Sequence, residues 1–213
     1  MWNKQSKAYL LALASVLCWS TVASAFKISL RYVDVFQLLF YSSLVSVFVL
    51  LAIILAQGKF RELKKLRAVD WLWSILLGAL NPWGYYLILF KAYDLLPAQE
   101  AQPLNYTWAI TLSLLSVPIL KQPLKAMDLL SLLLSYFGVY LISSSGDIGS
   151  LHFSDPLGVG LALGSTVIWS LYWIFNTMDK MDPVCRLFLN FISGTLLVGI
   201  STAVFSDLQV GSW

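Results

Sequence analysis

Long apolar stretches alternate with short polar turns along the whole chain, and this alternation predicts seven membrane-spanning helices. The expected spans cover residues 8–30, 33–56, 71–94, 98–120, 127–144, 156–179 and 183–206. Each approaches the length of about 20 residues at which a helix crosses the hydrocarbon core of a bilayer. No turn is long enough for a soluble domain. The pattern therefore predicts an all-α fold, a polytopic transmembrane helical bundle.

Composition agrees with a membrane protein. The chain is 59% hydrophobic and 12% charged, with a net charge of +3, whereas a soluble domain carries about 25% charged residues. The basic residues fall in turns, so the positive charge requires no nucleic-acid partner. Cys18, Cys185 and the single His152 show no disulfide or metal spacing. We expect membrane lipid as the surroundings, and no metal, cofactor or catalytic residues.

The basic residues also predict an orientation, because they favour cytoplasmic loops. With the N-terminus inside, 11 of the 14 Lys and Arg residues lie at the cytoplasmic side and 3 at the outer side. The inner residues are Lys4, Lys7, Lys59, Arg61, Lys64, Lys65, Arg67, Lys121, Lys125, Lys180 and Arg186; the outer ones are Lys27, Arg31 and Lys91. We expect an integral multi-pass protein of the cytoplasmic (inner) membrane, with the 144–155 loop outside.

The first span has a copy late in the chain. LALASVLCWS (11–20) matches LALGSTVIWS (161–170) at six of ten positions, and VDVFQLLF (33–40) aligns with MDPVCRLF (181–188). Residues 1–25 taken alone resemble a secretory signal, but the copy favours a retained helix. Five spans separate the copies, so the second enters the membrane from the opposite side, which is the pattern of an inverted repeat in secondary transporters.

The repeat divides the chain into 1–146, a first five-span unit, and 156–213, the first two spans of a second, inverted unit. Because three spans of the second unit are missing, either the sequence is truncated or two chains associate, for instance as a homodimer.

Three stretches resemble the EamA family of the drug/metabolite transporter superfamily. They are LALASVLCWSTVASAFKISL (11–30), YYLILFKAYDLLPAQEAQPLNYTW (85–108) and LLSLLLSYFGVYLISSSG (129–146). The resemblance implies ten helices in two inverted five-helix repeats. It also implies a permease that moves a small organic solute or metabolite, such as an amino acid or a drug-like compound, by alternating access, with export as the direction. Where many relatives have a glutamate after span 4 and an arginine in span 2, this chain has Lys121-Gln122-Pro123 and Phe40-Tyr41-Ser42.

Four tryptophans near the centres of their spans predict a binding site. Trp normally prefers the bilayer interfaces, yet Trp19, Trp83, Trp108 and Trp169 lie in the middles of spans 1, 3, 4 and 6. A lone Trp at this depth would fill the core; four at one depth favour an aromatic substrate-binding cavity near the midplane. In span 3, one face holds Asn81 and Tyr85, and another holds Trp83, Tyr86 and Phe90. We expect the Trp83 face to point at the cavity.

Amides and helix breakers lie beside these tryptophans. Gln99, Gln102, Asn105 and Tyr106 fall within an arc of about 120° on span 4, where they either line a cavity or hydrogen-bond helices together. Ser20 in span 1 joins the candidate substrate-binding residues. Asn81-Pro82 in span 3 and Pro103 in span 4 predict breaks, which occur both at transporter sites and at packing kinks.

Two charged residues have two readings each. Glu100 either favours a helix start at the outer interface or carries a proton. Lys27 either extends to the outer surface or binds a substrate carboxylate. Both are candidates for proton or ion coupling.

The sequence also offers two alternatives to a transporter. Asp94 and Asp147 faintly resemble the paired aspartates of an intramembrane aspartyl protease, but both lie at span edges, and Ser144-Ser145-Gly146-Asp147 lacks the first glycine of GxGD. The chain carries no HExxH or GxSxG motif, so we expect a non-enzyme. The third reading is a truncated membrane protein that does not transport.

Overall fold

The computed structural model describes residues 4–143 and 154–206, and all its regular elements there are helices. Six stretches are long and apolar enough to span a membrane: 5–29, 35–56, 68–95, 98–120, 156–178 and 183–205. The remaining predicted span is a shorter apolar helix at Ala126–Leu141. The all-α, polytopic prediction is therefore confirmed, with six spans of full length where seven were expected.

The elements follow the predicted spans with ends shifted by a few residues. They are α1 (Lys4–Ser29), α2 (Val35–Ala56), α3 (Phe60–Leu63), α4 (Ala68–Gly78), the π-helical turn η1 (Ala79–Gly84), α5 (Tyr85–Leu95), α6 (Ala98–Tyr106), α7 (Trp108–Leu120), α8 (Ala126–Ser143), α9 (Pro156–Met178) and α10 (Pro183–Phe205). The third span is thus the broken helix α4–η1–α5, and the fourth is α6–α7.

The two aligned segments begin their helices in the same way. Asp34 precedes α2 and accepts hydrogen bonds from the N–H groups of Phe36 and Gln37. Asp182 precedes α10 and accepts from Val184 and Cys185. Each carboxylate thereby satisfies two of the N–H groups that a helix start leaves free. The two aligned aspartates are therefore both helix N-caps.

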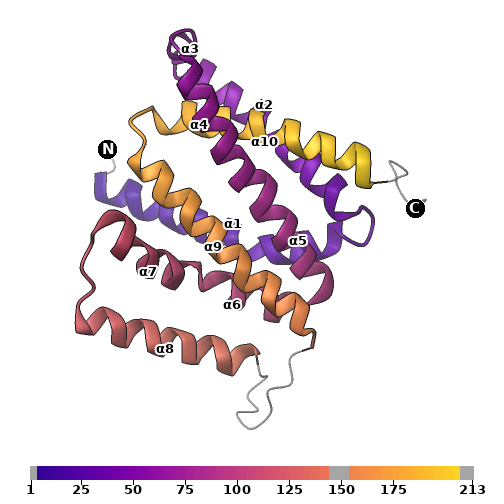
Figure 1. Ribbon diagram of the computed structural model, residues 1–213, viewed down its shortest axis with the longest axis vertical. Coiled ribbons are helices and arrows are strands. Elements are labelled where there is room, and N and C mark those ends of the chain that lie inside the picture. The colour runs from indigo at the N-terminus through magenta and orange to yellow at the C-terminus, as the bar shows by residue number, and fades with distance from the viewer. Residues whose placement is uncertain (1–3, 144–153, 207–213) are drawn as a thin grey trace.

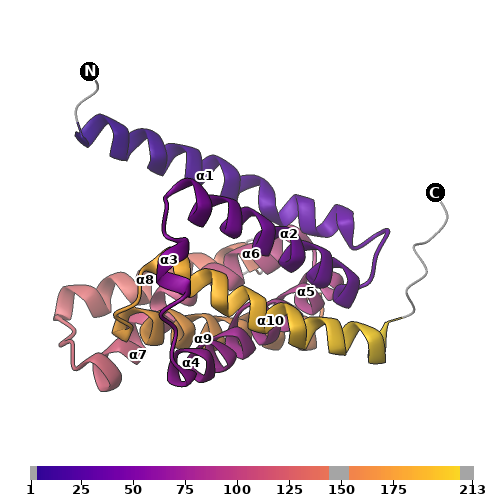
Figure 2. The same ribbon diagram turned by 90° about the horizontal axis from the view of Figure 1, so that it is seen from above.

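Helices α2 and α10 pack side by side in opposite directions (Figures 1 and 2). The start of α2 meets the end of α10, where Ser206 Oγ donates to Asp34 at 2.5 Å. The end of α2 meets the start of α10, where Lys59 Nζ lies 2.6 Å from Asp182 Oδ2. The two helices are therefore joined by polar contacts at both ends.

Helix α1 ends near the place where α9 begins. Lys27 in the last turn of α1 contacts the end of α5, and Gly158 in the first turn of α9 packs against Leu96 just after α5. Helices α1 and α9 consequently run in opposite directions across the bundle (Figure 1). The expected outer loop at 144–155 and the chain end at 207–213 lie, but for Ser154 and Asp155, outside the described residues.

Candidate functional site

The third span is broken at its centre, as Asn81-Pro82 predicted. Asn81 has extended dihedrals (φ −150°, ψ 121°) inside η1, whereas its neighbours remain helical. Pro82 has no N–H to donate, so the α-helical bond pattern cannot continue through this turn. The fourth span also breaks, at Thr107 between α6 and α7, four residues after Pro103. Both breaks adjoin the residues that form the site.

A cavity of about 160 Å³ lies between α1, α5 and α6. For comparison, a buried apolar cavity of about 150 Å³ in another protein holds a benzene molecule. No charged side chain is among the described residues that line the cavity. Its wall is mainly aromatic with two amides, and its residues are Cys18, Trp19, Val22, Phe26, Tyr85, Tyr86, Leu89, Tyr93, Gln102, Asn105 and Tyr106.

Asn105 connects the cavity to the inside of the bundle. It is buried, and the hydroxyl of Tyr85 on α5 donates to its Oδ1 at 3.3 Å. Its Nδ2 donates to Ser165 Oγ on α9 at 3.2 Å. The predicted amide of span 4 therefore lines the cavity and also bonds helices together, so the two readings of Asn105 hold at once.

Gln102 lies at the more exposed side of the same wall. Its Nε2 donates to the Tyr106 hydroxyl at 2.9 Å and to the backbone carbonyl of Trp19 at 3.4 Å. The bond to Trp19 joins α6 to α1 across the cavity edge, whereas the bond to Tyr106 lies within α6. By contrast Gln99, on the same predicted arc, is exposed and does not line the cavity.

Trp169 supports the cavity from behind. It is buried, and its ring lies 4.5 Å from that of Tyr85 and 6.4 Å from that of Trp108. Its Nε1 has no hydrogen-bond partner among the described residues. Trp169 thus packs against Tyr85, which lines the cavity, but does not line the cavity itself. A direct contribution of Trp169 to the lining was expected.

A wider groove of about 750 Å³ runs beside the cavity along α1, α6 and α7. Trp19, Gln102 and Tyr106 line both hollows, so the groove and the cavity share one wall. Ser20 and Trp108 line only the groove. Five of the seven proposed substrate-binding residues therefore lie along this continuous surface.

Trp83 and Trp169 are the two exceptions, and of the span 3 face predicted to point at the cavity only Tyr86 lines it. The Nε1 of Trp83 donates to Ser201 Oγ on α10 at 2.9 Å, and its ring packs in a cluster with Leu39, Phe90 and Val198. Tyr85, from the other predicted face, lines the cavity beside Tyr86, so both faces contribute to the wall. The reason is the π-helical turn, because its wider i→i+5 spacing rotates the residues after it away from the α-helical register.

Lys27 and Glu100 have structural partners. The Lys27 ammonium donates to the carbonyls of Tyr93, Asp94 and Leu96 at 2.6, 3.1 and 3.0 Å, so it caps the end of α5. Glu100 lies in the first turn of α6 and accepts a hydrogen bond from Ser154. Neither side chain lines the cavity, which favours their simpler roles at the helix ends.

Asp94, one half of the protease alternative, is exposed and paired with Lys91 at 2.7 Å. The other half, Asp147, lies outside the described residues. Asp94 therefore does not have the buried environment that a catalytic carboxylate in a membrane would need.

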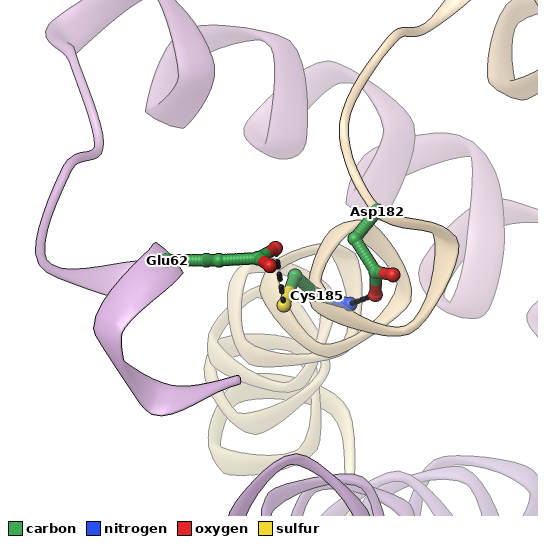
Figure 3. Close-up of side chains that lie close together, drawn as sticks. All are labelled: Glu62, Asp182 and Cys185. Atoms are coloured by element: carbon green, nitrogen blue, oxygen red, sulfur yellow. Dashed lines mark hydrogen bonds between the residues drawn. The ribbon is translucent and has the colours of Figure 1, made fainter. Parts of the chain in front are cut away.

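Three residues with metal-binding groups meet at the other end of the bundle: Glu62, Asp182 and Cys185 have ligand atoms within 4.8 Å of one another (Figure 3). Asp182 uses Oδ1 to cap α10 and Oδ2 to pair with Lys59. The hydrogen bond from Lys59 lowers the pKa of Asp182 below its usual value. Because both oxygens are engaged, this cluster is accounted for by a helix cap and an ion pair.

Sequence reasoning missed the ion pairs of Arg186, counting it only as a basic residue at the membrane edge. Arg186 is the one charged residue that is buried among those the structure describes. Its Nε lies 2.5 Å from Asp179, and it donates to the Asp70 carbonyl at 2.9 Å and to Ser74 Oγ at 2.7 Å. Asp70, at the start of span 3, and Asp179, at the end of span 6, could have indicated partners for Arg186 in the sequence.

Comparison with known proteins points to one class. A family model described as "EamA-like transporter family" matches residues 6–144. A solved crystal structure matches with a TM-score of 0.65 and 23% identity, over 97% of this chain and 69% of that one. At that identity the match supports the fold alone.

Three curated relatives carry transporter names. An "Uncharacterized transporter" of Archaeoglobus fulgidus is 27% identical over 91% of this chain and 66% of its own length. YvbV, an uncharacterized transporter of Bacillus subtilis, is 28% identical over 64% of this chain and 46% of its own. YhbE, an uncharacterized inner membrane transporter of Escherichia coli, is 22% identical over 78% and 52%. The chain thus spans about half to two thirds of these relatives.

Proposed function

The chain belongs to the EamA-like transporter family, and on that basis we propose that it takes part in moving a small, uncharged or cationic aromatic solute across the membrane. The observation that carries this proposal is the cavity between α1, α5 and α6. Its described lining holds four tyrosines, a tryptophan and two amides, and no charged side chain. Such a surface offers π faces and hydrogen bonds to an organic solute.

The charge of the solute follows from the same lining. An anion entering this cavity would lose its hydration without gaining a cationic partner, which is costly in a low-dielectric site. Lys27, which contacts the backbone of the cavity residue Tyr93, is already engaged by three backbone carbonyls. A cation would gain from the faces of Trp19 and the tyrosines. Neutral and cationic aromatic compounds therefore fit better than carboxylates.

The mechanism proposed is alternating access between inverted repeats. Opposite directions of α1 and α9, and the shared aspartate caps of α2 and α10, support units at 1–146 and 156–213. The proposed orientation places the N-terminus and α3 in the cytoplasm, with export as the direction that the family resemblance implies.

The test is solute flux in proteoliposomes, with an aromatic amine, an uncharged aromatic compound and an aromatic carboxylate as the panel. We expect saturable, protein-dependent flux of one of the first two. Trp19→Ala should weaken apparent affinity roughly 5- to 30-fold, corresponding to about 1–2 kcal/mol of lost ring contact, because Trp19 lines both the cavity and the groove. Leu133→Ala, an exposed position on α8, is the control and should leave affinity unchanged. A preference for the carboxylate, or equal effects of both variants, would refute the site.

A further inference from the structure

A second polar cluster lies inside the bundle, away from the aromatic cavity, at the break of the third span. It consists of Asn81 in η1, Tyr172 on α9 and Asn190 on α10. All three are nearly inaccessible, with 3%, 2% and 0% of their surface exposed. Polar side chains buried to this degree within a membrane bundle are costly unless they have partners or a function.

Hydrogen bonding within the cluster is incomplete. Asn190 Nδ2 donates to the Tyr172 hydroxyl at 3.3 Å, and the turn η1 that carries Asn81 packs against both α9 and α10. The Oδ1 atoms of both asparagines lack a partner among the described residues. The Tyr172 hydroxyl carries one hydrogen and can donate to only one of these two amide oxygens.

The backbone around the cluster is tightly held. A Cβ added at Gly78 would lie 2.6 Å from the carbonyl oxygen of Asn190, and one added at Gly194 would lie 2.4 Å from Pro82. The broken span and α10 therefore touch backbone to backbone beside the two asparagines. This contact holds together the two backbone segments that carry Asn81 and Asn190.

We propose that Asn81, Tyr172 and Asn190 form a binding site for a monovalent cation, Na⁺. Amide and hydroxyl oxygens are hard ligands that suit alkali and alkaline-earth ions and not soft metals. The cluster contains no carboxylate, so a divalent ion would carry two uncompensated charges into a low-dielectric interior. Interrupted helices at mid-depth are also where Na⁺ binds in secondary transporters.

The nearest buried charge does not oppose a cation. Arg186 lies one helical turn before Asn190 on α10, and it is held by Asp179 at 2.5 Å and by Asp70 at 3.9 Å. Two carboxylates around one guanidinium leave no excess positive charge facing the asparagines. The Na⁺ site stands on these contacts alone, whereas its role as a coupling ion rests on the proposed transport function.

The direct test needs no solute. The purified chain in lipid nanodiscs is unfolded by heat in NaCl, KCl or choline chloride at equal ionic strength. Because a ligand that binds only the folded state stabilises it by mass action, we expect the midpoint temperature to rise saturably with Na⁺ above its value in choline. Equal midpoints in the three salts at every concentration would overturn the site, and would indicate a buried water in its place.

Two variants locate the effect. Asn81→Leu and Asn190→Leu each remove one amide oxygen at nearly constant volume, and each should abolish the Na⁺-dependent shift. Asn105→Leu is the matched control, since it also removes a buried asparagine but lies in the aromatic cavity. It should keep the Na⁺ shift while losing solute binding. If both leucine variants retained the wild-type shift, Na⁺ would bind elsewhere; should one fail to fold, the other and the wild-type salt series still decide.

Discussion

Replacing Arg186 by leucine should destabilise the protein more than any other single removal of a charge. Arg186 is 4% exposed, and its guanidinium joins the start of α4, the end of α9 and α10. The partner side chains of Asp179 and Asp70 are only 10% and 17% exposed. Leucine would fill most of the volume but leave two carboxylates with little access to water.

The size of the effect follows from this burial. Removing one partner of a buried ion pair costs about 3–5 kcal/mol, because the other charge remains in a low-dielectric site. The lost hydrogen bonds to Ser74 and to the Asp70 carbonyl are part of that figure and are not added to it. An exposed ion pair contributes only about 0–1 kcal/mol. Lys91, paired with Asp94 at side-chain exposures of 50% and 44%, supplies that comparison.

The assay is reversible unfolding of the purified protein in mixed micelles, followed by circular dichroism. We expect Arg186→Leu to lose about 3–5 kcal/mol of the free energy of unfolding, and Lys91→Ala to lose about 1 kcal/mol or less. Adding Asp179→Asn to Arg186→Leu should recover part of the loss, because one stranded charge is removed. Equal stabilities of the Arg186 and Lys91 variants, or no recovery in the double variant, would refute this reasoning.

Three further predictions concern other parts of the fold. Gly194→Ala should cost about 1–3 kcal/mol by overpacking, since its Cβ would lie 2.4 Å from the proline ring in the helix break; unchanged unfolding would contradict the close crossing. The pKa of Asp182 is lowered by Lys59 and that of Lys59 is raised by Asp182, so their pair stabilises between the two values. The destabilisation by Lys59→Gln in unfolding titrations should therefore disappear as pH falls through the pKa of Asp182 or rises through that of Lys59, and a pH-independent effect would contradict the pairing. Single cysteines at Lys64 and Arg31, in a background without the native cysteines, should react with an impermeant maleimide from opposite sides of the membrane; labelling from one side would contradict the proposed orientation.

Much of the fold could be predicted because it depends on local patterns. Apolar length set the spans to within a few residues, and Asn81-Pro82 located the break in the third span, since proline removes a donor wherever it stands. The cavity lining was only partly predictable. Asn105 was identified because an amide in an apolar span needs a partner, whatever that partner is.

The errors arose where the answer depends on neighbours in space. Tyr85 lines the cavity beside Tyr86, and Trp83 does not, because a regular helical wheel does not hold across a π-helical turn. Lys27 caps α5, a contact that joins residues 66 positions or more apart and leaves no periodic signal. Trp169 supports the cavity through Tyr85, and the sequence has no pattern that separates a lining ring from a supporting one.

The most direct test of the central claim is binding of an aromatic solute to the cavity between α1, α5 and α6. The chain in nanodiscs is titrated with the uncharged and cationic aromatic compounds of the flux panel, and the change in tryptophan fluorescence is recorded for the wild type and for Asn105→Leu. The account predicts saturable binding of at least one such compound, lost in Asn105→Leu and retained in the exposed control Leu133→Ala. Saturable binding that Asn105→Leu leaves unchanged, or binding of aromatic carboxylates alone, would contradict it.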